Sequence, residues 1–210
     1  MESENENFDY AELGFKCGLE VHQQLDTHKL FCNCPSILRK DDPDFTIKRK
    51  LHAVAGESGE VDLAAEFQVS KNLEFIYQAY DSTCLFELDE MPPYEINSEA
   101  LNVALQIAIF LNARITPITQ IMRKIVVDGS NTSGFQRTVL IARDGYVETK
   151  FGRVGIDTIC LEEDSARIIE RKQDSITYRL DRLGIPLVEI ATSPDIKNPN
   201  QAKEVALYLG

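Results

Sequence analysis

The sequence predicts an α+β fold in which helices pack on a largely antiparallel sheet. Apolar residues recur at helical spacing in two segments of the first half of the chain. After residue 112 the pattern changes to short apolar runs that follow one another closely. Parallel strands need a crossover of a dozen or more residues, and these runs leave no room for one. The later strands are therefore expected to pair antiparallel.

The first 55 residues predict loops and strands. Residues 1–12 are rich in Asp and Glu and are expected to form a flexible acidic N-terminus. Alternating apolar residues predict a strand over 15–25 and a shorter one over 29–32. A loop rich in Asp and Pro is expected over 35–44, ahead of a strand predicted at 47–55.

Two helices are predicted next, separated by a strand. Asp62 is a suitable N-cap, and apolar residues at helical spacing predict an amphipathic helix over 62–80. A strand is expected at 83–88. Ser98 is predicted to cap a second helix, over 98–111, with a broad apolar face.

The second half of the chain predicts mostly strands. They are expected at 115–127, 138–142, 146–151, 154–161, 175–180 and 187–191. Asp144-Gly145 is expected to form a hairpin turn, because this pair readily supplies a positive φ. Asn198 and Pro199 predict the start of a helix that is still short when it reaches Gly210. Residues 13–210 are therefore expected to be the N-terminal portion of a larger domain.

Composition and charge narrow the possible functions. The net charge of −12 leaves no basic surface for nucleic acid at the level of the whole chain, so any RNA contact must be local. No apolar stretch approaches the roughly 20 residues that cross a bilayer, and the acidic start differs from a signal peptide. We expect a soluble cytoplasmic protein with no membrane partner.

Acidic residues gather where three apolar runs end. Glu20 and His22 lie two residues apart in a predicted strand and therefore share a face. A second cluster occupies 162–164, and a third contains Glu189. Carboxylates that converge repel one another unless a cation neutralises them, and oxygen ligands suit Mg²⁺ or Mn²⁺. The pattern favours a Mg²⁺–nucleotide site, with three solvated strand ends as the alternative.

A polar loop with a cation at each end lies between Lys124 and Arg137. Seven of these residues, Ser130 and Thr132 among them, are Gly, Ser, Asn, Thr or Asp. Backbone N–H groups and hydroxyls in such a loop can cradle phosphates. The composition is equally compatible with a plain surface turn.

The five cysteines form an odd set, and disulfides are not expected. Cys32 and Cys34 have the spacing of half a zinc knuckle, and folding could bring Cys84 to them as a third ligand. No second Cys pair or His completes a set of four. Structural Zn²⁺ at these three residues and three separate thiols both remain open.

Four ordered segments, 18–27, 122–138, 160–164 and 180–190, together resemble the family formed by the B-type and E-type subunits of tRNA-dependent amidotransferases. The loop sequence Asp-Gly-Ser-Asn-Thr followed by Gly-Phe-Gln-Arg-Thr is similar to the archaeal E-type branch, which acts in glutamyl-tRNA(Gln) amidotransferase. The resemblance runs in order from about residue 15 to the last residue.

This resemblance implies the catalytic cradle of the family, which is similar to the glutamine synthetase core. It implies that ATP phosphorylates the side-chain carboxylate of glutamate on tRNA(Gln), and that ammonia then displaces phosphate to give Gln-tRNA(Gln). An asparaginase-like D-type partner is the implied ammonia donor. Family members are several hundred residues long, and the domains that grip Glu-tRNA(Gln) have no counterpart in these 210 residues.

The resemblance also implies roles for individual residues. His22, Glu163 and Glu189 match metal-binding positions, and Glu20 is expected to share the site. Arg182 is a candidate for neutralising the acyl phosphate, with pairing to Asp181 or Asp164 as the alternative. The candidates for ATP phosphate contacts are Lys124, Ser130, Thr132 and Arg137.

Two other functions fit the same residues. A folded fragment that binds metal or a partner subunit without catalysis is one, and the abrupt end of the last helix supports it. The other is a carboxylate–amine ligase with a glutamine-synthetase-like core that acts on a free small molecule. A requirement for tRNA distinguishes the amidotransferase from this ligase.

Overall fold

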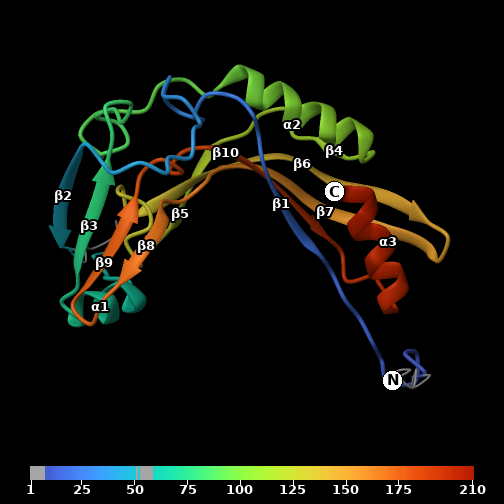
Figure 1. Ribbon diagram of the computed structural model, residues 1–210. Coiled ribbons are helices and arrows are strands. Elements are labelled where there is room, and N and C mark those ends of the chain that lie inside the picture. The colour runs from blue at the N-terminus through green and yellow to red at the C-terminus, as the bar shows by residue number, and fades with distance from the viewer. Residues whose placement is uncertain (1–7, 51, 53–58) are drawn as a thin grey trace.

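The computed structural model describes residues 8–50, 52 and 59–210. Two sheets and three helices form an arch, with the larger sheet across its top and one side and the smaller sheet in the opposite limb (Figure 1). None of the described helices has the length and apolar character needed to cross a membrane.

The larger sheet has six strands in the order β1-β10-β7-β6-β4, and β5 pairs with β6. All of these pairings are antiparallel. Its strands are β1 (Glu20–Gln24), β4 (Arg114–Ile115), β5 (Ile121–Ile125), β6 (Phe135–Thr149), β7 (Gly152–Glu163) and β10 (Pro186–Thr192). The first strand lies beside the last, with His22 opposite Glu189.

The smaller sheet has the order β2-β3-β9-β8. Its strands are β2 (Phe45–Lys50), β3 (Glu74–Ala79), β8 (Arg167–Arg171) and β9 (Ser175–Arg179). β3 and β9 are parallel, whereas the other two pairings are antiparallel. The described sheets are thus largely antiparallel, which confirms the predicted mixed α+β class.

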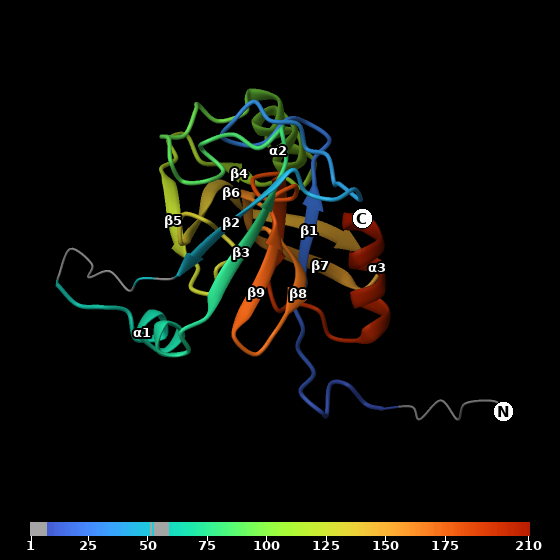
Figure 2. The ribbon, with the colours of Figure 1, turned by 60° about the vertical axis from the view of Figure 1, so that its left-hand side comes forward.

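Three helices accompany the sheets: α1 (Leu63–Ser70), α2 (Ser98–Phe110) and α3 (Pro199–Leu209). The small residues Ala100, Ala104 and Ala108 are fully buried and let α2 approach the outer face of the larger sheet. A second core joins Phe75 and Tyr178 of the smaller sheet with their neighbours. Figure 2 shows that α1 lies at the far end of the smaller sheet, away from α2 and α3.

The prediction of a helix over 62–80 is correct for the first half of that segment and wrong for the second. Asp62 caps α1 as expected, accepting a hydrogen bond from the Ala65 N–H, but the helix ends at Ser70. Asn72 then adopts a positive φ of 50°, and β3 follows. In β3 the buried residues alternate with half-buried ones, which is the period of a strand in a packed sheet.

Other local predictions also differ from the structure. Residues 29–32 form a buried bend and residues 83–88 a partly buried turn rather than strands. The hairpin turn lies at residues 150–151, and Asp144-Gly145 is inside β6, where Asp144 has a φ of 57°. Asn97, not Ser98, caps α2, because its side-chain oxygen accepts hydrogen bonds from the N–H groups of Glu99 and Ala100. The end of the strand predicted at 47–55 falls outside the described residues.

Strand predictions elsewhere have shifted bounds. The 115–127 segment contains two short strands, β4 and β5, instead of one. The 15–25 segment is paired as a strand only over β1, with an isolated bridge from Cys17 to Ile196 ahead of it. Asn198 caps α3 as predicted and accepts a hydrogen bond from the Gln201 N–H, with Pro199 in the first turn.

Candidate functional site

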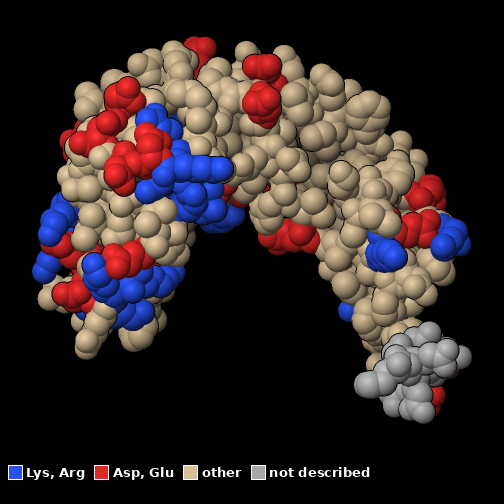
Figure 3. Space-filling model, in the orientation of Figure 1, with Lys and Arg blue, Asp and Glu red and all other residues tan. Residues whose placement is uncertain are grey.

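The concave face of the larger sheet carries the polar residues of the candidate site. Residues directly opposite each other on paired strands share a face, and the face alternates along each strand. Glu189 is opposite both His22 and Cys160, and Glu162 is opposite both Leu187 and Thr138. The intervening residues of these strands belong to the core beneath α2, so this polar face is the uncovered one. In Figure 3 acidic atoms line the underside of the arch near its middle.

Glu20, His22 and Glu189 come together on this face. The His22 Nε2 atom is 3.1 Å from Glu189 Oε2 and 3.5 Å from Glu20 Oε1. One potential ligand atom from each residue lies within 4.8 Å of the others. The Glu189 side chain is 18% exposed and that of Glu20 62%, so the group is anchored in the sheet and open to solvent.

Lys124 and Glu162 extend the same face toward β5. Glu162 is fully buried, and its carboxylate accepts hydrogen bonds from Lys124 Nζ at 2.9 Å and from the Thr138 hydroxyl at 2.8 Å. Burial lowers the pKa of Lys124, whereas the ionised Glu162 and, to a smaller extent, Glu189 raise it. The two carboxylates outweigh burial, so the net shift of the Lys124 pKa is upward. Lys124 therefore stays charged beside the carboxylates, as a phosphate-binding group must.

The structure does not bring Glu163 to His22 and Glu189. Alternation along β7 turns Glu163 to the opposite face from Glu162, where it is 3% exposed. There it accepts hydrogen bonds from the Arg137 side chain at 3.1 Å and from the Arg137 N–H at 3.2 Å. Burial raises the pKa of Glu163, and Arg137 opposes part of that rise. Of the three predicted metal ligands, His22 and Glu189 therefore lie on the concave face of the sheet and Glu163 on the opposite face.

Arg137 itself is held in an aromatic enclosure. Its guanidinium carbon lies 4.7 Å from the ring centre of Phe86 and 4.9 Å from that of Phe135. Cations are attracted to ring faces at these distances. Arg137 is therefore fixed by packing as well as by Glu163, and its side chain is only 13% exposed.

The predicted phosphate loop is tied to the smaller sheet. Tyr178 donates a hydrogen bond to the Asp128 carbonyl, and Tyr77 donates one to the Gly129 carbonyl. Ser130 is buried, and its N–H is satisfied by Asp128 Oδ1. The Thr132 hydroxyl donates to the Glu87 carbonyl at 2.7 Å. These hydrogen bonds connect the loop to the smaller sheet and to the turn that contains Glu87.

The same loop lines a cavity of about 310 Å³ against the smaller sheet. Its lining also includes the cations Arg49 and Lys50, the imidazole of His52 and the carboxylate of Asp89. Asn131, on the loop wall, is 3% exposed, and its Oδ1 atom has no hydrogen-bond partner among the described residues. Two cations against one carboxylate leave this lining suited to an anion.

Arg182 is next to Asp164, which also accepts a 2.6 Å hydrogen bond from the Gln24 side chain of β1. Its guanidinium donates to the Ser165 carbonyl at 2.8 Å and lies 3.5 Å from Asp164 Oδ1. Asp181 pairs instead with Arg167 at 2.5 Å. Of the two predicted pairings for Arg182, the structure shows the one with Asp164.

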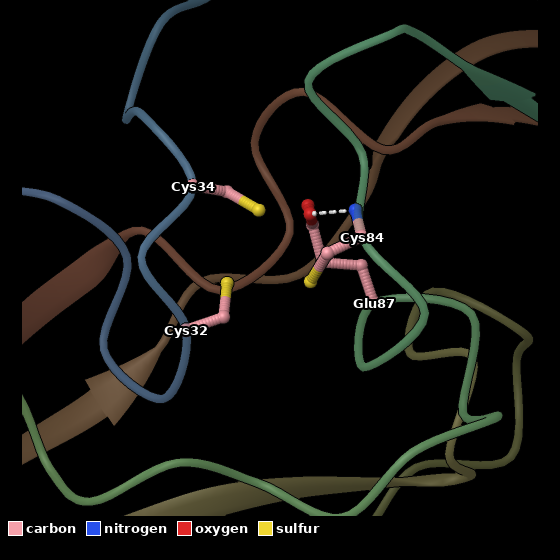
Figure 4. A group of neighbouring side chains, drawn as sticks. All are labelled: Cys32, Cys34, Cys84 and Glu87. Atoms are coloured by element: carbon pink, nitrogen blue, oxygen red, sulfur yellow. Dashed lines mark hydrogen bonds between the residues drawn. The ribbon is translucent and has the colours of Figure 1, made fainter.

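Cys32, Cys34 and Cys84 lie together, as the zinc hypothesis required, and Glu87 joins them (Figure 4). Sequence reasoning missed Glu87 and its buried partner Lys29. The available signal was the Cys-x-x-Glu spacing, which repeats the separation of a Cys-x-x-Cys ligand pair with a carboxylate in second place.

The fold and the polar face define the class of this protein: an α+β domain with a candidate cation site on an open, curved sheet. The chain belongs to the GatB/GatE catalytic domain family, which matches residues 15–210.

Curated relatives agree with this membership. The chain is 57% identical over 203 residues to the E-type subunit of glutamyl-tRNA(Gln) amidotransferase from Methanocaldococcus jannaschii, covering 96% of this chain and 32% of that protein. It is 56% identical over 207 residues to the E-type subunits from Methanosarcina acetivorans and Pyrococcus horikoshii, covering 98% of this chain and 33% and 32% of theirs. The chain thus spans about a third of the length of these relatives.

Proposed function

We propose that this chain forms part of the catalytic domain of an enzyme that converts Glu-tRNA(Gln) to Gln-tRNA(Gln) with ATP and ammonia. The observation that carries the proposal is the convergence of Glu20, His22 and Glu189 on the open face of the sheet, in a chain closely similar to E-type amidotransferase subunits. An asparaginase-like partner subunit is the proposed source of ammonia.

The reaction needs an activated carboxyl group. An oxygen of the glutamate side chain attacks the γ-phosphorus of ATP, the bond to the ADP oxygen breaks, and an acyl phosphate forms. Ammonia then forms a C–N bond, phosphate leaves with the former carboxylate oxygen, and the nitrogen loses a proton. This sequence supplies the good leaving group that a free carboxylate lacks.

The donor atoms on the concave face fit a divalent cation. Two carboxylates and one imidazole match the ligands of Mn²⁺, and carboxylates with water match those of Mg²⁺. We assign Glu20, His22 and Glu189 to this ion, which when bound would offset negative charge on phosphoryl oxygens. The face of the sheet leaves these three groups accessible to a nucleotide and to the end of a tRNA.

The remaining predicted residues take different parts in the proposal. Lys124, fixed by Glu162 on the same face, is proposed to contact ATP phosphates. Glu163 is proposed to position Arg137 instead of binding the ion. Thr132 is proposed to line the cavity beside Arg49 and Lys50, which can accept an anionic portion of a substrate, and Ser130 is proposed to support the loop behind it.

A single acid-to-amide change tests the assignment. Glu189→Gln should lower Glu-tRNA(Gln)-dependent ATP cleavage by the complete enzyme at least about a hundredfold, because loss of a ligand carboxylate removes several kcal/mol of charge stabilisation. It should also weaken Mn²⁺ binding measured by electron paramagnetic resonance. The matched control is Glu148→Gln, which changes an exposed acid paired with Arg153 at the hairpin end.

Unchanged cleavage and unchanged Mn²⁺ binding in Glu189→Gln would contradict the metal assignment. Turnover of free glutamate without tRNA would contradict the proposed substrate and favour a small-molecule ligase. Formation of Gln-tRNA(Gln) when ammonium chloride replaces the partner subunit would support the assignment of ammonia delivery to that partner.

A further inference from the structure

Gln24 is the last polar side chain that β1 presents on the concave face of the larger sheet. Alternation along the strand places it on the same face as Glu20 and His22, two of the proposed ion ligands. Gln24 is half-buried and is not part of the cluster that those residues form with Glu189. Its amide therefore faces the space in which the amidation is proposed to take place.

A carboxylate fixes the direction of the Gln24 amide. Gln24 Nε2 donates a 2.6 Å hydrogen bond to Asp164 Oδ2 in a partly buried position. An ionised carboxylate only accepts hydrogen bonds, so the NH₂ group of the amide must face Asp164. The amide oxygen, Oε1, then points away from Asp164, and it accepts no hydrogen bond from the described residues. An oriented and unoccupied acceptor is the result.

Asp164 is itself held in place. Its Oδ1 atom accepts a 2.8 Å hydrogen bond from the Ser165 N–H and lies 3.5 Å from Arg182 Nε. The Asp164 N–H donates to the Ile185 carbonyl at 2.8 Å, and the carboxylate is only 14% exposed. Because these donors engage Oδ1, Oδ2 is left for Gln24.

The strand pairing shows which groups surround the Gln24 amide. Gln24 is opposite Leu187, which is opposite Glu162, so these three residues form one row across the sheet, and His22 belongs to the next row. Rows on one face are about 7 Å apart along the strands, and two strand spacings separate Gln24 from Glu162 by about 10 Å. A carboxyl group on this face can therefore lie between Gln24 and Lys124, the partner of Glu162.

We propose that Gln24 Oε1 accepts a hydrogen bond from the ammonia that attacks the acyl phosphate, and that Asp164 is the positioning residue that orients the amide. This role rests on the proposed function and concerns its second step. In that step the nitrogen lone pair forms a bond to the acyl carbon, and the bond from this carbon to the phosphate oxygen breaks. Phosphate leaves with that electron pair and takes up the proton that the nitrogen loses. Holding the nucleophile at the acyl carbon lowers the entropic part of the barrier.

A neutral acceptor suits ammonia better than a carboxylate would. An ionised carboxylate favours the charged form of a neighbouring base. Ammonium has no free electron pair, so it cannot attack the acyl carbon. The amide oxygen of Gln24 binds an N–H group without this effect, on a face where Glu20 and Glu189 already supply carboxylates.

Gln24→Met tests the proposal in the complete enzyme, with ammonium chloride as the nitrogen donor. Methionine is similar in length and offers only a weakly accepting sulfur. The KM for ammonium in Gln-tRNA(Gln) formation should rise about fivefold or more, as expected for the loss of one hydrogen bond. At low ammonium less Gln-tRNA(Gln) should form per ADP, and high ammonium should restore the ratio. Gln23→Met is the matched control, because Gln23 is exposed and lies on the opposite face of β1.

A second variant, Asp164→Asn, keeps the test valid if Gln24→Met fails to fold. Ser165 and Arg182 both face Oδ1, so the new NH₂ group takes the place of Oδ2 and faces Gln24. The Gln24 amide should then turn over and present its own NH₂ group to the ammonia, which raises the KM for ammonium. Asp164→Asn combined with Gln24→Met should be no worse than Gln24→Met alone, since both changes remove the same hydrogen bond.

The outcomes separate this role from a structural one. Folded Gln24→Met and Asp164→Asn enzymes with the same KM for ammonium as Gln23→Met would overturn the proposal. So would additive losses in the double variant, or an equal rise in the KM for ATP, because a general structural defect has these effects. A wild-type enzyme that forms no Gln-tRNA(Gln) from ammonium chloride would refute the proposed function together with this role, so the two failures are distinguishable.

Discussion

Replacing Glu163 separates a structural role for this residue from a metal-binding one. In Glu163→Leu the Arg137 guanidinium loses its carboxylate partner but remains enclosed, since its side chain is only 13% exposed. An uncompensated buried charge of this kind costs about 3–5 kcal/mol in the free energy of unfolding. For a domain of this size such a loss lowers the melting temperature by about 6–20 °C.

The assay is urea unfolding followed by circular dichroism, with thermal unfolding as a second measure. Glu148→Leu is the control, because it removes an exposed carboxylate whose pairing with Arg153 is worth at most about 1 kcal/mol. Removing both members of the buried pair, in Arg137→Met with Glu163→Leu, should recover at least half of the lost stability. A Glu163→Leu protein as stable as the Glu148 control, but with weakened Mn²⁺ binding, would refute the structural assignment.

The remaining predictions concern the 128–134 loop. Gly129→Ala should destabilise the protein by about 2–5 kcal/mol in urea unfolding, because Gly129 has a φ of +83° and an added Cβ would lie 2.6 Å from the Phe75 ring. Gly134→Ala should cost only about 1–2 kcal/mol, since its φ of +75° is strained but its Cβ meets open space; equal losses would contradict the packing argument. Burial raises the pKa of Tyr178 from 10.0 to about 12, so its stabilising effect should be complete below pH 10 and lost as the pH rises toward 12. Loss of the hydrogen bond from Tyr178 to Asp128 should then speed amide hydrogen exchange in the loop. Tyr178→Phe should show the same faster exchange at neutral pH. A wild-type exchange rate that does not change with pH, after correction for base catalysis, would contradict this prediction.

Local patterns predicted the fold class but not every element. Leu73, Ile76, Tyr77 and Tyr80 match helical spacing, yet the alternation from Phe75 onward is equally regular. The choice is made by parallel pairing with β9, a hundred residues further along the chain. A pattern within one segment carries no information about that partner, which is why the strand was missed.

The candidate site was predicted only in part, because some of it also depends on packing between distant segments. Alternation along a strand places Glu20 with His22 and separates Glu162 from Glu163, and both relations hold in the structure. Which face of β7 would be covered depends on where α2 packs, and a strand sequence with polar residues on both faces leaves that undecided. The neighbour of the cysteines, Glu87, was missed because a turn, not a strand, carries it.

The pairing of β1 with β10 has a consequence for how the chain folds during synthesis. His22 contacts Glu189, which is 167 residues later in the sequence. β3 likewise pairs with β9, a strand from much later in the chain. A ribosome must therefore synthesise β9 and β10 before either sheet can be completed, and the strands that pair with them have unpaired edges until then. Such non-local contacts slow folding and expose strand edges to association. We expect folding of this domain to be late and cooperative, and its nascent chain to depend on chaperones more than a helical domain of equal length would.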